Sequence, residues 1–161
     1  MADKKKEQAM VVSQEQIADG IFSMWIHTEA AQSARPGQFI SMYTKDATKL
    51  LPRPISICEA DKENGRLRIV YRIAGAGTKE FSAYKEGDTL DIMGPLGNGF
   101  PLKKKKAFLI GGGIGIPPML ELAKNLDCEK TAVIGYRDKE TFLADELRKY
   151  ADVVIATEDG S

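Results

Sequence analysis

An arginine between two prolines is the first feature of the sequence that could bind a ligand. Pro52 and Pro54 flank Arg53 in the segment "LPRPISIC" (residues 51–58), and Ser56 follows between two isoleucines. Because proline cannot donate to a sheet ladder, the two prolines favour the beginning or the edge of a strand. Arginine is permanently charged and carries a fork of donors that fits phosphate. We therefore expect Arg53 to bind phosphate and the Ser56 hydroxyl to lie beside a polar ring edge of a planar cofactor. A plain surface ion pair at Arg53 is the alternative.

A second phosphate-type sequence follows the strand that we expect over residues 65–73. The segment "YRIAGAGT" ends with Gly75, Gly77 and Thr78, and a helix is predicted to follow over residues 77–84. Backbone N–H groups at a helix N-terminus can bind phosphate. Two such sites in one region favour ligand binding over a plain ion pair at Arg53.

A run of glycines separates an apolar strand from a helix in "AFLIGGGIGIPPML". Gly111, Gly112, Gly113 and Gly115 let the backbone approach a ligand closely, and the following helix N-terminus favours an anion such as a pyrophosphate. The run does not match the G-x-G-x-x-G fingerprint, so a tight turn without a ligand is the alternative. The two prolines that follow stiffen the beginning of the helix, which suits a preformed dinucleotide site.

The secondary structure predicted for the segments that position these residues changes near residue 101. Before it, short segments rich in β-branched and aromatic residues are separated by turn signals such as Asn64-Gly65. These expected strands cover residues 9–13, 20–28, 36–43, 53–60, 65–73 and 88–94. Closely spaced antiparallel strands of this kind predict a small closed barrel.

After the lysine run at 103–106, strands alternate with helices, which predicts parallel β-α-β units. The expected strands are residues 107–110, 131–136 and 152–157, and the expected helices are residues 117–126 and 139–150. We therefore predict a barrel domain at residues 1–101 and an α/β domain at residues 102–161. Three strands are one half of a doubly wound sheet, so we expect a chain that is truncated at its C-terminus.

The composition argues against several classes of protein. Lys+Arg and Asp+Glu both number 23, and this zero net charge argues against nucleic-acid binding. No stretch approaches the roughly 18 apolar residues of a membrane span, and the N-terminus lacks the apolar core of a secretion signal. We therefore expect a cytoplasmic protein. One histidine and two cysteines cannot by themselves assemble a zinc or iron–sulfur site.

The motifs, taken in order, resemble the ferredoxin reductase superfamily. They are the RPxS strand, the GxGT turn, the loop "GPLGNGF" and the nucleotide turn "GGGIG". The sequences of the first three motifs are similar to those of the electron-transfer subunits of class B dihydroorotate dehydrogenases. The resemblance covers about residues 11–161. It implies an N-terminal antiparallel flavin-binding β-barrel followed by a partial doubly wound parallel α/β domain that binds a nucleotide.

The resemblance implies which residues bind FAD. They are Arg53, Pro54, Ile55, Ser56, Val70, Tyr71, Arg72, Gly77 and Thr78. Arg53 would contact the pyrophosphate and Ser56 the isoalloxazine edge. Residues 70–72 would line the adenine or ribityl side, and Gly77 and Thr78 would hold the pyrophosphate from the other side.

The resemblance also implies a site for a nicotinamide dinucleotide. It would be formed by Gly111, Gly112, Gly113, Gly115 and Ile116, with Arg137 nearby. Glu158 and Asp159 follow the third strand, where carboxylates would repel the 2′-phosphate of NADP and suit the free ribose hydroxyl of NAD. Ordinary turn acids are the alternative for this pair. No side chain is implied to be catalytic, since the flavin carries the chemistry.

The same resemblance implies a place in a larger enzyme. The chain would be a subunit of an NAD-dependent flavoprotein oxidoreductase of pyrimidine biosynthesis. Electrons from dihydroorotate would pass from an FMN in a partner catalytic subunit, across a [2Fe–2S] cluster, to FAD and then to NAD⁺, in a heterotetramer. Family members carry the cluster on a C-terminal four-cysteine region, which Cys58 and Cys128 do not match. We therefore expect no cluster on this chain, which as a fragment could be inactive alone.

Two alternatives remain from the sequence. The first is the flavin subunit of a related ferredoxin–NAD(P) or sulfide-linked reductase, which has the same barrel. The second is a non-catalytic barrel that binds only its partner subunit, and such a protein would be colourless.

Overall fold

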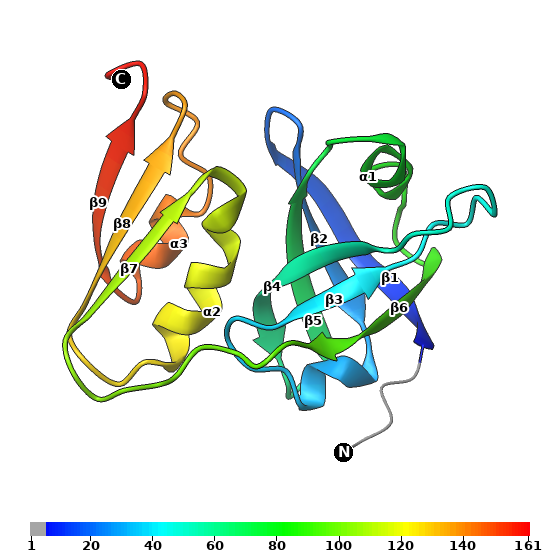
Figure 1. The fold of residues 1–161 in the computed structure, drawn as a ribbon, viewed down its shortest axis with the longest axis horizontal. Coiled ribbons are helices and arrows are strands. Elements are labelled where there is room, and N and C mark those ends of the chain that lie inside the picture. The colour runs from blue at the N-terminus through cyan, green and yellow to red at the C-terminus, as the bar shows by residue number, and fades with distance from the viewer. Residues whose placement is uncertain (1–5) are drawn as a thin grey trace.

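The computed structural model describes residues 6–161, so the first five residues of the predicted barrel domain lie outside the described part. Six antiparallel strands form a closed barrel in the order β1-β2-β5-β4-β3-β6, as predicted (Figure 1). The strands are β1 (Lys6–Ala18), β2 (Ile21–His27), β3 (Phe39–Met42), β4 (Arg53–Asp61), β5 (Arg66–Arg72) and β6 (Thr89–Leu96). The predicted boundary at residue 101 falls in the segment 97–106, which joins β6 to the next strand.

Successive side chains of a strand point to opposite faces, and in this barrel both faces carry apolar residues. On β5, Leu67, Ile69 and Tyr71 pack in the barrel interior. Val70 points outward and joins a second apolar cluster with the α/β part of the chain. The barrel therefore has a core of its own and an outer face on which the second part packs.

Two short helices complete the barrel. Helix α1 (Ala76–Phe81) follows β5 and precedes β6 in the chain, and its range overlaps the predicted helix at 77–84. The 3-10 helix η1 (Glu29–Gln32) was not predicted. It begins where the Thr28 hydroxyl accepts a hydrogen bond from the N–H of Ala30 at 3.1 Å, an N-cap that the Thr-Glu sequence could have indicated.

The α/β part has a three-stranded parallel sheet in the order β7-β8-β9, which confirms the predicted β-α-β units. Its elements are β7 (Ala107–Gly112), the 3-10 helix η2 (Gly113–Gly115), α2 (Pro117–Asn125), β8 (Lys130–Tyr136), α3 (Ala144–Arg148) and β9 (Asp152–Thr157). Helix α3 is shorter than the predicted helix at 139–150. The Asp138 carboxylate accepts a hydrogen bond from the N–H of Glu140 at 2.8 Å, and such local bonds compete with a helix.

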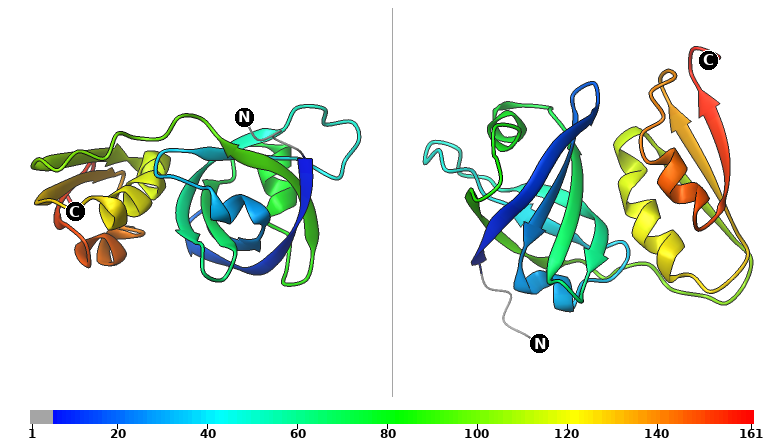
Figure 2. Two further views of the ribbon diagram at one scale, coloured as in Figure 1. Left: turned by 90° about the horizontal axis from the view of Figure 1, so that it is seen from below. Right: turned by 180° about the vertical axis from the view of Figure 1, so that it is seen from behind.

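Helix α2 lies between the barrel and the parallel sheet (Figures 1 and 2). Its apolar residues Met119 and Leu120 share one buried cluster with Ile21, Cys58 and Val70 of the barrel. The opposite face of the sheet is open, with Phe108 65% and Ile110 75% exposed. None of the helices described for residues 6–161 is long and apolar enough to cross a membrane.

Candidate functional site

Arg53 lies against Gly77, at the beginning of α1. A Cβ atom at Gly77 would lie 2.7 Å from Nε and 2.9 Å from Cζ of Arg53, so any other residue would displace the guanidinium from this position. A second nitrogen of the guanidinium donates to the carbonyl of Leu51. The structure thus brings together two segments that were separately predicted to bind phosphate. The first N–H groups of a helix have no partner within it, so positive charge and free donors lie side by side here.

Thr78 shapes the turn before α1. Its hydroxyl accepts hydrogen bonds from the N–H groups of Ala74 at 2.8 Å and Gly75 at 3.2 Å. It also lies 3.1 Å from the carbonyl oxygen of Gly75, to which it donates. The side chain is buried and fixes the course of the backbone that leads to Gly77.

The strand after Arg53 alternates between the barrel interior and its outer surface. Ile57 belongs to the interior core and Ile55 packs against it. Pro54 is exposed and Ser56 half-buried, and both take the alternate positions on the strand. A planar ligand that follows Arg53 would therefore lie against Pro54 and Ser56, whereas the Ile55 side chain supports the strand from within.

The structure separates the three residues at 70–72. Tyr71 is 1% exposed in the barrel core, where its hydroxyl donates to Gln14 Oε1 at 2.5 Å and its ring stacks on Phe22. Val70 is buried under the α/β part. Among these three residues, Arg72 lines a cavity. Gln14 was not singled out from the sequence, which offers no local signal for this contact.

The glycines after β7 divide into two kinds. A Cβ atom at Gly111 would lie 3.0 Å from the carbonyl oxygen of Gly115 and 3.2 Å from the Met119 side chain. Gly111 therefore permits close packing of the turn on α2. Cβ atoms at Gly112 and Gly115 would meet nothing within 4 Å, and Gly113 has a φ of 53°. The open glycines leave backbone accessible to a ligand, whereas Gly111 is required by the fold.

The beginning of α2 differs from a usual anion site. Pro117 and Pro118 occupy the first positions of α2 and carry no N–H group. The N–H of Met119 is already bonded to the carbonyl of Ile116 at 2.9 Å, and the Ile116 side chain is fully buried. Donors to a phosphate would therefore come from the glycine turn, while Ile116 acts in the core.

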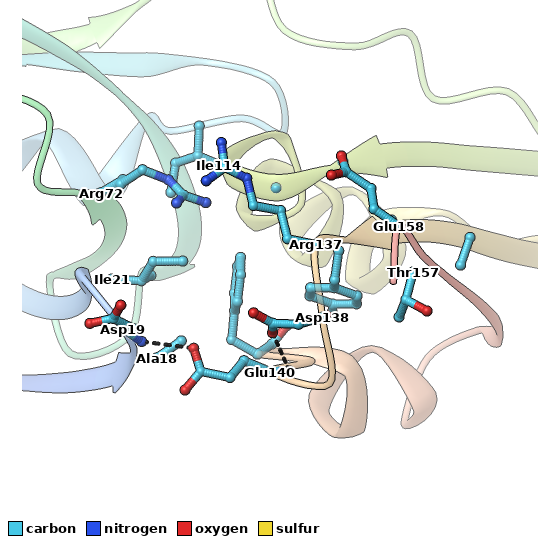
Figure 3. Close-up of a pocket in the computed structure, with 16 residues that line it drawn as sticks. Ala18, Asp19, Ile21, Arg72, Ile114, Arg137, Asp138, Glu140, Thr157 and Glu158 are labelled. Atoms are coloured by element: carbon cyan, nitrogen blue, oxygen red, sulfur yellow. Dashed lines mark hydrogen bonds between the residues drawn. The ribbon is translucent and has the colours of Figure 1, made fainter. Parts of the chain in front are cut away.

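A cavity of about 620 Å³ lies between the barrel and the carboxyl ends of the parallel strands (Figure 3). Its lining includes Arg72 from the barrel, Gly112 at the end of β7, Gly113 after it, Arg137 after β8 and Glu158 after β9. Ligands of open α/β sheets bind at this edge of the sheet. The structure therefore joins the glycine turn to two arginines from different parts of the fold.

Two residues that line this cavity join the two parts of the chain by a hydrogen bond. The N–H of Asp19, in the β1–β2 turn, donates to Glu140 Oε2 at 3.0 Å. Neither residue was singled out from the sequence. Of the two predicted acids after β9, Glu158 lines the cavity. Asp159 is hydrogen-bonded to the Ser161 N–H at 3.0 Å, and this contact lowers the pKa of its carboxyl.

No group of three or more His, Cys, Asp or Glu side chains within residues 6–161 is placed to hold a metal ion. Cys58 is buried beneath α2 and Cys128 is half-buried in the α2–β8 loop.

Comparison with known proteins gives the class of this fold and site. Residues 8–100 match the oxidoreductase FAD-binding domain family, and the chain belongs to that family. Over nearly its whole length it is similar to curated proteins named dihydroorotate dehydrogenase B (NAD(+)), electron transfer subunit. The protein of Streptococcus mutans is 47% identical, with 97% of this chain and 64% of that protein covered. The protein of Listeria innocua is 42% identical, with 94% and 63% covered.

A solved structure of an NADH-dependent reduced ferredoxin–NADP oxidoreductase has the same fold. It superposes with a TM-score of 0.88 at 31% identity and covers 100% of this chain and 59% of its own. These findings confirm the resemblance and the two-part fold inferred from the motifs. The chain spans somewhat less than two thirds of the length of the curated relatives described above.

Proposed function

We propose that this chain binds FAD on its barrel and acts as the electron-transfer part of a dihydroorotate dehydrogenase B that reduces NAD⁺. The observation that carries the proposal is the Arg53 guanidinium packed on Gly77, inside the range that matches the FAD-binding family. The donor set fits the cofactor, because a fixed guanidinium beside a helix N-terminus complements a pyrophosphate. When bound, FAD would supply hydride and single-electron transfer.

The residues of the chain would bind and orient this cofactor. Arg53 would neutralise the pyrophosphate, and Gly77 would leave room for the guanidinium of Arg53. Pro54 and Ser56 would support the isoalloxazine on the outer surface of β4. Thr78 would hold the turn, and Val70 and Tyr71 would keep the strand in place from its two faces.

The cavity beside the glycine turn would receive the nicotinamide dinucleotide. Gly112, Gly113 and Gly115 would offer backbone donors, and Arg72 and Arg137 would counter the phosphate charge. Glu158 would disfavour a 2′-phosphate and so select NAD over NADP. In this proposal residues 1–101 form the FAD domain and residues 102–161 the beginning of the NAD domain.

The relatives are named as electron transfer subunits, which implies a catalytic partner subunit, and the family resemblance suggests its cofactors. We infer an FMN-containing dihydroorotate dehydrogenase subunit as the electron donor, reached across a [2Fe–2S] cluster that Cys58 and Cys128 do not bind. The assembly would be a heterotetramer of pyrimidine biosynthesis. A subunit of a ferredoxin–NADP oxidoreductase is the second candidate, favoured by the structural similarity at 31% identity. The identities of 41–47% to the dihydroorotate dehydrogenase subunits favour the first.

The test begins with the visible absorption spectrum of the purified chain before and after anaerobic addition of NADH. A yellow protein that bleaches supports both sites. Arg53→Ala should lose at least about tenfold in FAD affinity, the effect of losing one charge-assisted contact. Arg66→Ala removes an exposed arginine of the same barrel and should bind FAD normally. A wild-type chain that is colourless and takes up no added FAD would contradict the proposal and support the partner-binding barrel.

A further inference from the structure

We propose that Glu80 is a positioning residue for FAD, because it holds the segment 44–51 on α1 and thereby sets Arg53 on Gly77. This inference rests on the proposed FAD site and adds a residue that does not touch the cofactor. Glu80 Oε2 accepts a hydrogen bond from the backbone N–H of Lys45 at 2.9 Å and another from the Tyr84 hydroxyl at 2.6 Å. Gly77 and Glu80 are three residues apart on α1 and so lie on neighbouring positions of one helix face.

A carboxylate this close to a pyrophosphate site needs an explanation, since its charge would repel the ligand. Burial favours the neutral form of Glu80, but the hydrogen bonds from Tyr84 and from the backbone of Lys45 and Asp46 outweigh it and lower the pKa. Glu80 is therefore an ionised acceptor at neutral pH, with one donor just after α1 and one on the segment before Arg53. Attachment of that segment, rather than ligand contact, accounts for the bond from Lys45.

The segment that Glu80 holds is internally fixed. Asp46 Oδ1 accepts hydrogen bonds from the N–H of Thr48 at 2.9 Å and from its hydroxyl at 2.6 Å. The N–H of Lys49 donates to the Asp46 carbonyl at 3.0 Å, and its ammonium lies 3.2 Å from the Asp46 carboxylate. The hydrogen bonds of Thr48 lower the pKa of Asp46 to about 2, so the carboxylate that accepts them is ionised at neutral pH.

The turn formed by Asp46, Thr48 and Lys49 influences the position of Arg53 through residues 50–52, which connect them. Residues 50–52 lead directly into β4, and the Leu51 carbonyl accepts a hydrogen bond from the Arg53 guanidinium. A shift of the turn would therefore move an acceptor that orients this guanidinium.

Helix α1 is itself fixed to the barrel. Gln14 Nε2, on β1, donates to the carbonyls of Phe81 at 2.9 Å and Tyr84 at 2.8 Å. The buried hydroxyl of Tyr71 orients the same Gln14 amide. Glu80 thus connects a segment with few other attachments to a helix that the core holds in place.

The experiment is a double-mutant cycle on FAD affinity with Glu80→Ala, Arg53→Ala and the double variant. Glu80→Ala should weaken FAD binding about tenfold, and should weaken it by less than about twofold when Arg53 is already alanine. Riboflavin, which has no pyrophosphate, should bind all variants within about twofold of wild type. Glu86→Ala removes an exposed carboxylate from the turn after α1 and should leave FAD affinity unchanged.

A second measurement needs no ligand. Hydrogen exchange of residues 44–53 should be faster in Glu80→Ala than in wild type, while exchange in the barrel core stays the same. The proposal is overturned if the two substitutions act additively, if riboflavin binding falls in parallel with FAD binding, or if exchange at 44–53 is unchanged. A wild-type chain that binds neither flavin would refute the proposed function and with it the role of Glu80 toward FAD, and the exchange result would then show only whether Glu80 holds the segment 44–51.

Discussion

Arg68 on β5 and Glu146 on α3 form an ion pair across the junction of the barrel and the α/β part, with 2.6 Å between Nη1 and Oε1. The same guanidinium lies 2.8 Å from Glu59 on β4, and its Nε donates to the Ser23 hydroxyl at 2.8 Å. Lys124 on α2 lies 3.0 Å from the other oxygen of Glu59. Burial disfavours the charge on Arg68, but these hydrogen bonds outweigh it and raise the pKa. Paired charges thus fix the α/β part on the barrel beside the shared apolar cluster.

Arg68→Ala should lower the free energy of unfolding by about 1.5–3 kcal/mol, because the half-buried Glu59 would keep only Lys124 as a charged partner. Glu146 is 38% exposed, so its share of this loss is small. Urea denaturation followed by circular dichroism measures the change. Arg148→Ala breaks the exposed pair with Asp145 and should cost less than about 1 kcal/mol. Equal effects of the two substitutions would mean that the junction is not held by these charges.

Gly111→Ala should destabilise the chain by about 1–3 kcal/mol, because the added methyl would press on the carbonyl of Gly115 and on Met119. Gly115→Ala meets no atom within 4 Å and should change stability by less than about 0.5 kcal/mol. Thermal denaturation of the two variants gives the stability comparison, and an NADH titration tests the site. If Gly115→Ala binds NADH as tightly as wild type, this glycine does not face the nucleotide.

Tyr71→Phe should cost about 1 kcal/mol of stability, because it leaves the Gln14 amide oxygen without its donor. FAD affinity should change little, since the phenol ring lies in the barrel interior. Urea denaturation of the apoprotein and a flavin titration measure the two quantities separately. A loss of FAD affinity at unchanged stability would support Tyr71 as a direct cofactor contact.

Cys58 should make stability depend on pH in the alkaline range. Burial is the main reason that the pKa of its thiol is raised above the ordinary value of 9.0. The stability that the buried thiol contributes is therefore complete below that value. It is lost as the pH rises further, because the unfolded thiol ionises while the folded one stays neutral.

Denaturation of wild type and Cys58→Ala at increasing alkaline pH tests this linkage. The wild type should lose more stability with each step in pH than the variant. Cys128→Ala, at a half-buried position, should behave as wild type. In the native chain a thiol reagent should modify Cys128 and spare Cys58. Rapid modification of Cys58 would contradict its placement under α2.

Much of the fold could be predicted from local patterns. Short segments rich in β-branched and aromatic residues, separated by turn signals, predicted the six barrel strands, and the change of pattern after the lysine run at 103–106 predicted the parallel units. The same period of two places Leu67, Ile69 and Tyr71 on one face, so the inward direction of Tyr71 was open to prediction from the sequence. The glycine and proline signals located both turns of the candidate site.

Contacts between distant residues could not be predicted. Arg68 pairs with a residue 78 positions away, and Glu80 bonds to a backbone group 35 positions away. Neither pair has a local pattern, because the closure of the barrel and the docking of the α/β part decide which side chains meet. The late beginning of α3 depends on a side-chain bond from Asp138 that overrides helical propensity.

Helix α2 packs on two surfaces, one face of the parallel sheet and the outer wall of the barrel. A barrel cut off after residue 101 would therefore expose Ile21, Cys58 and Val70 to water. Contiguous apolar surface of this kind promotes self-association. Although its strands close on themselves, the barrel depends on the second part of the chain for its solubility.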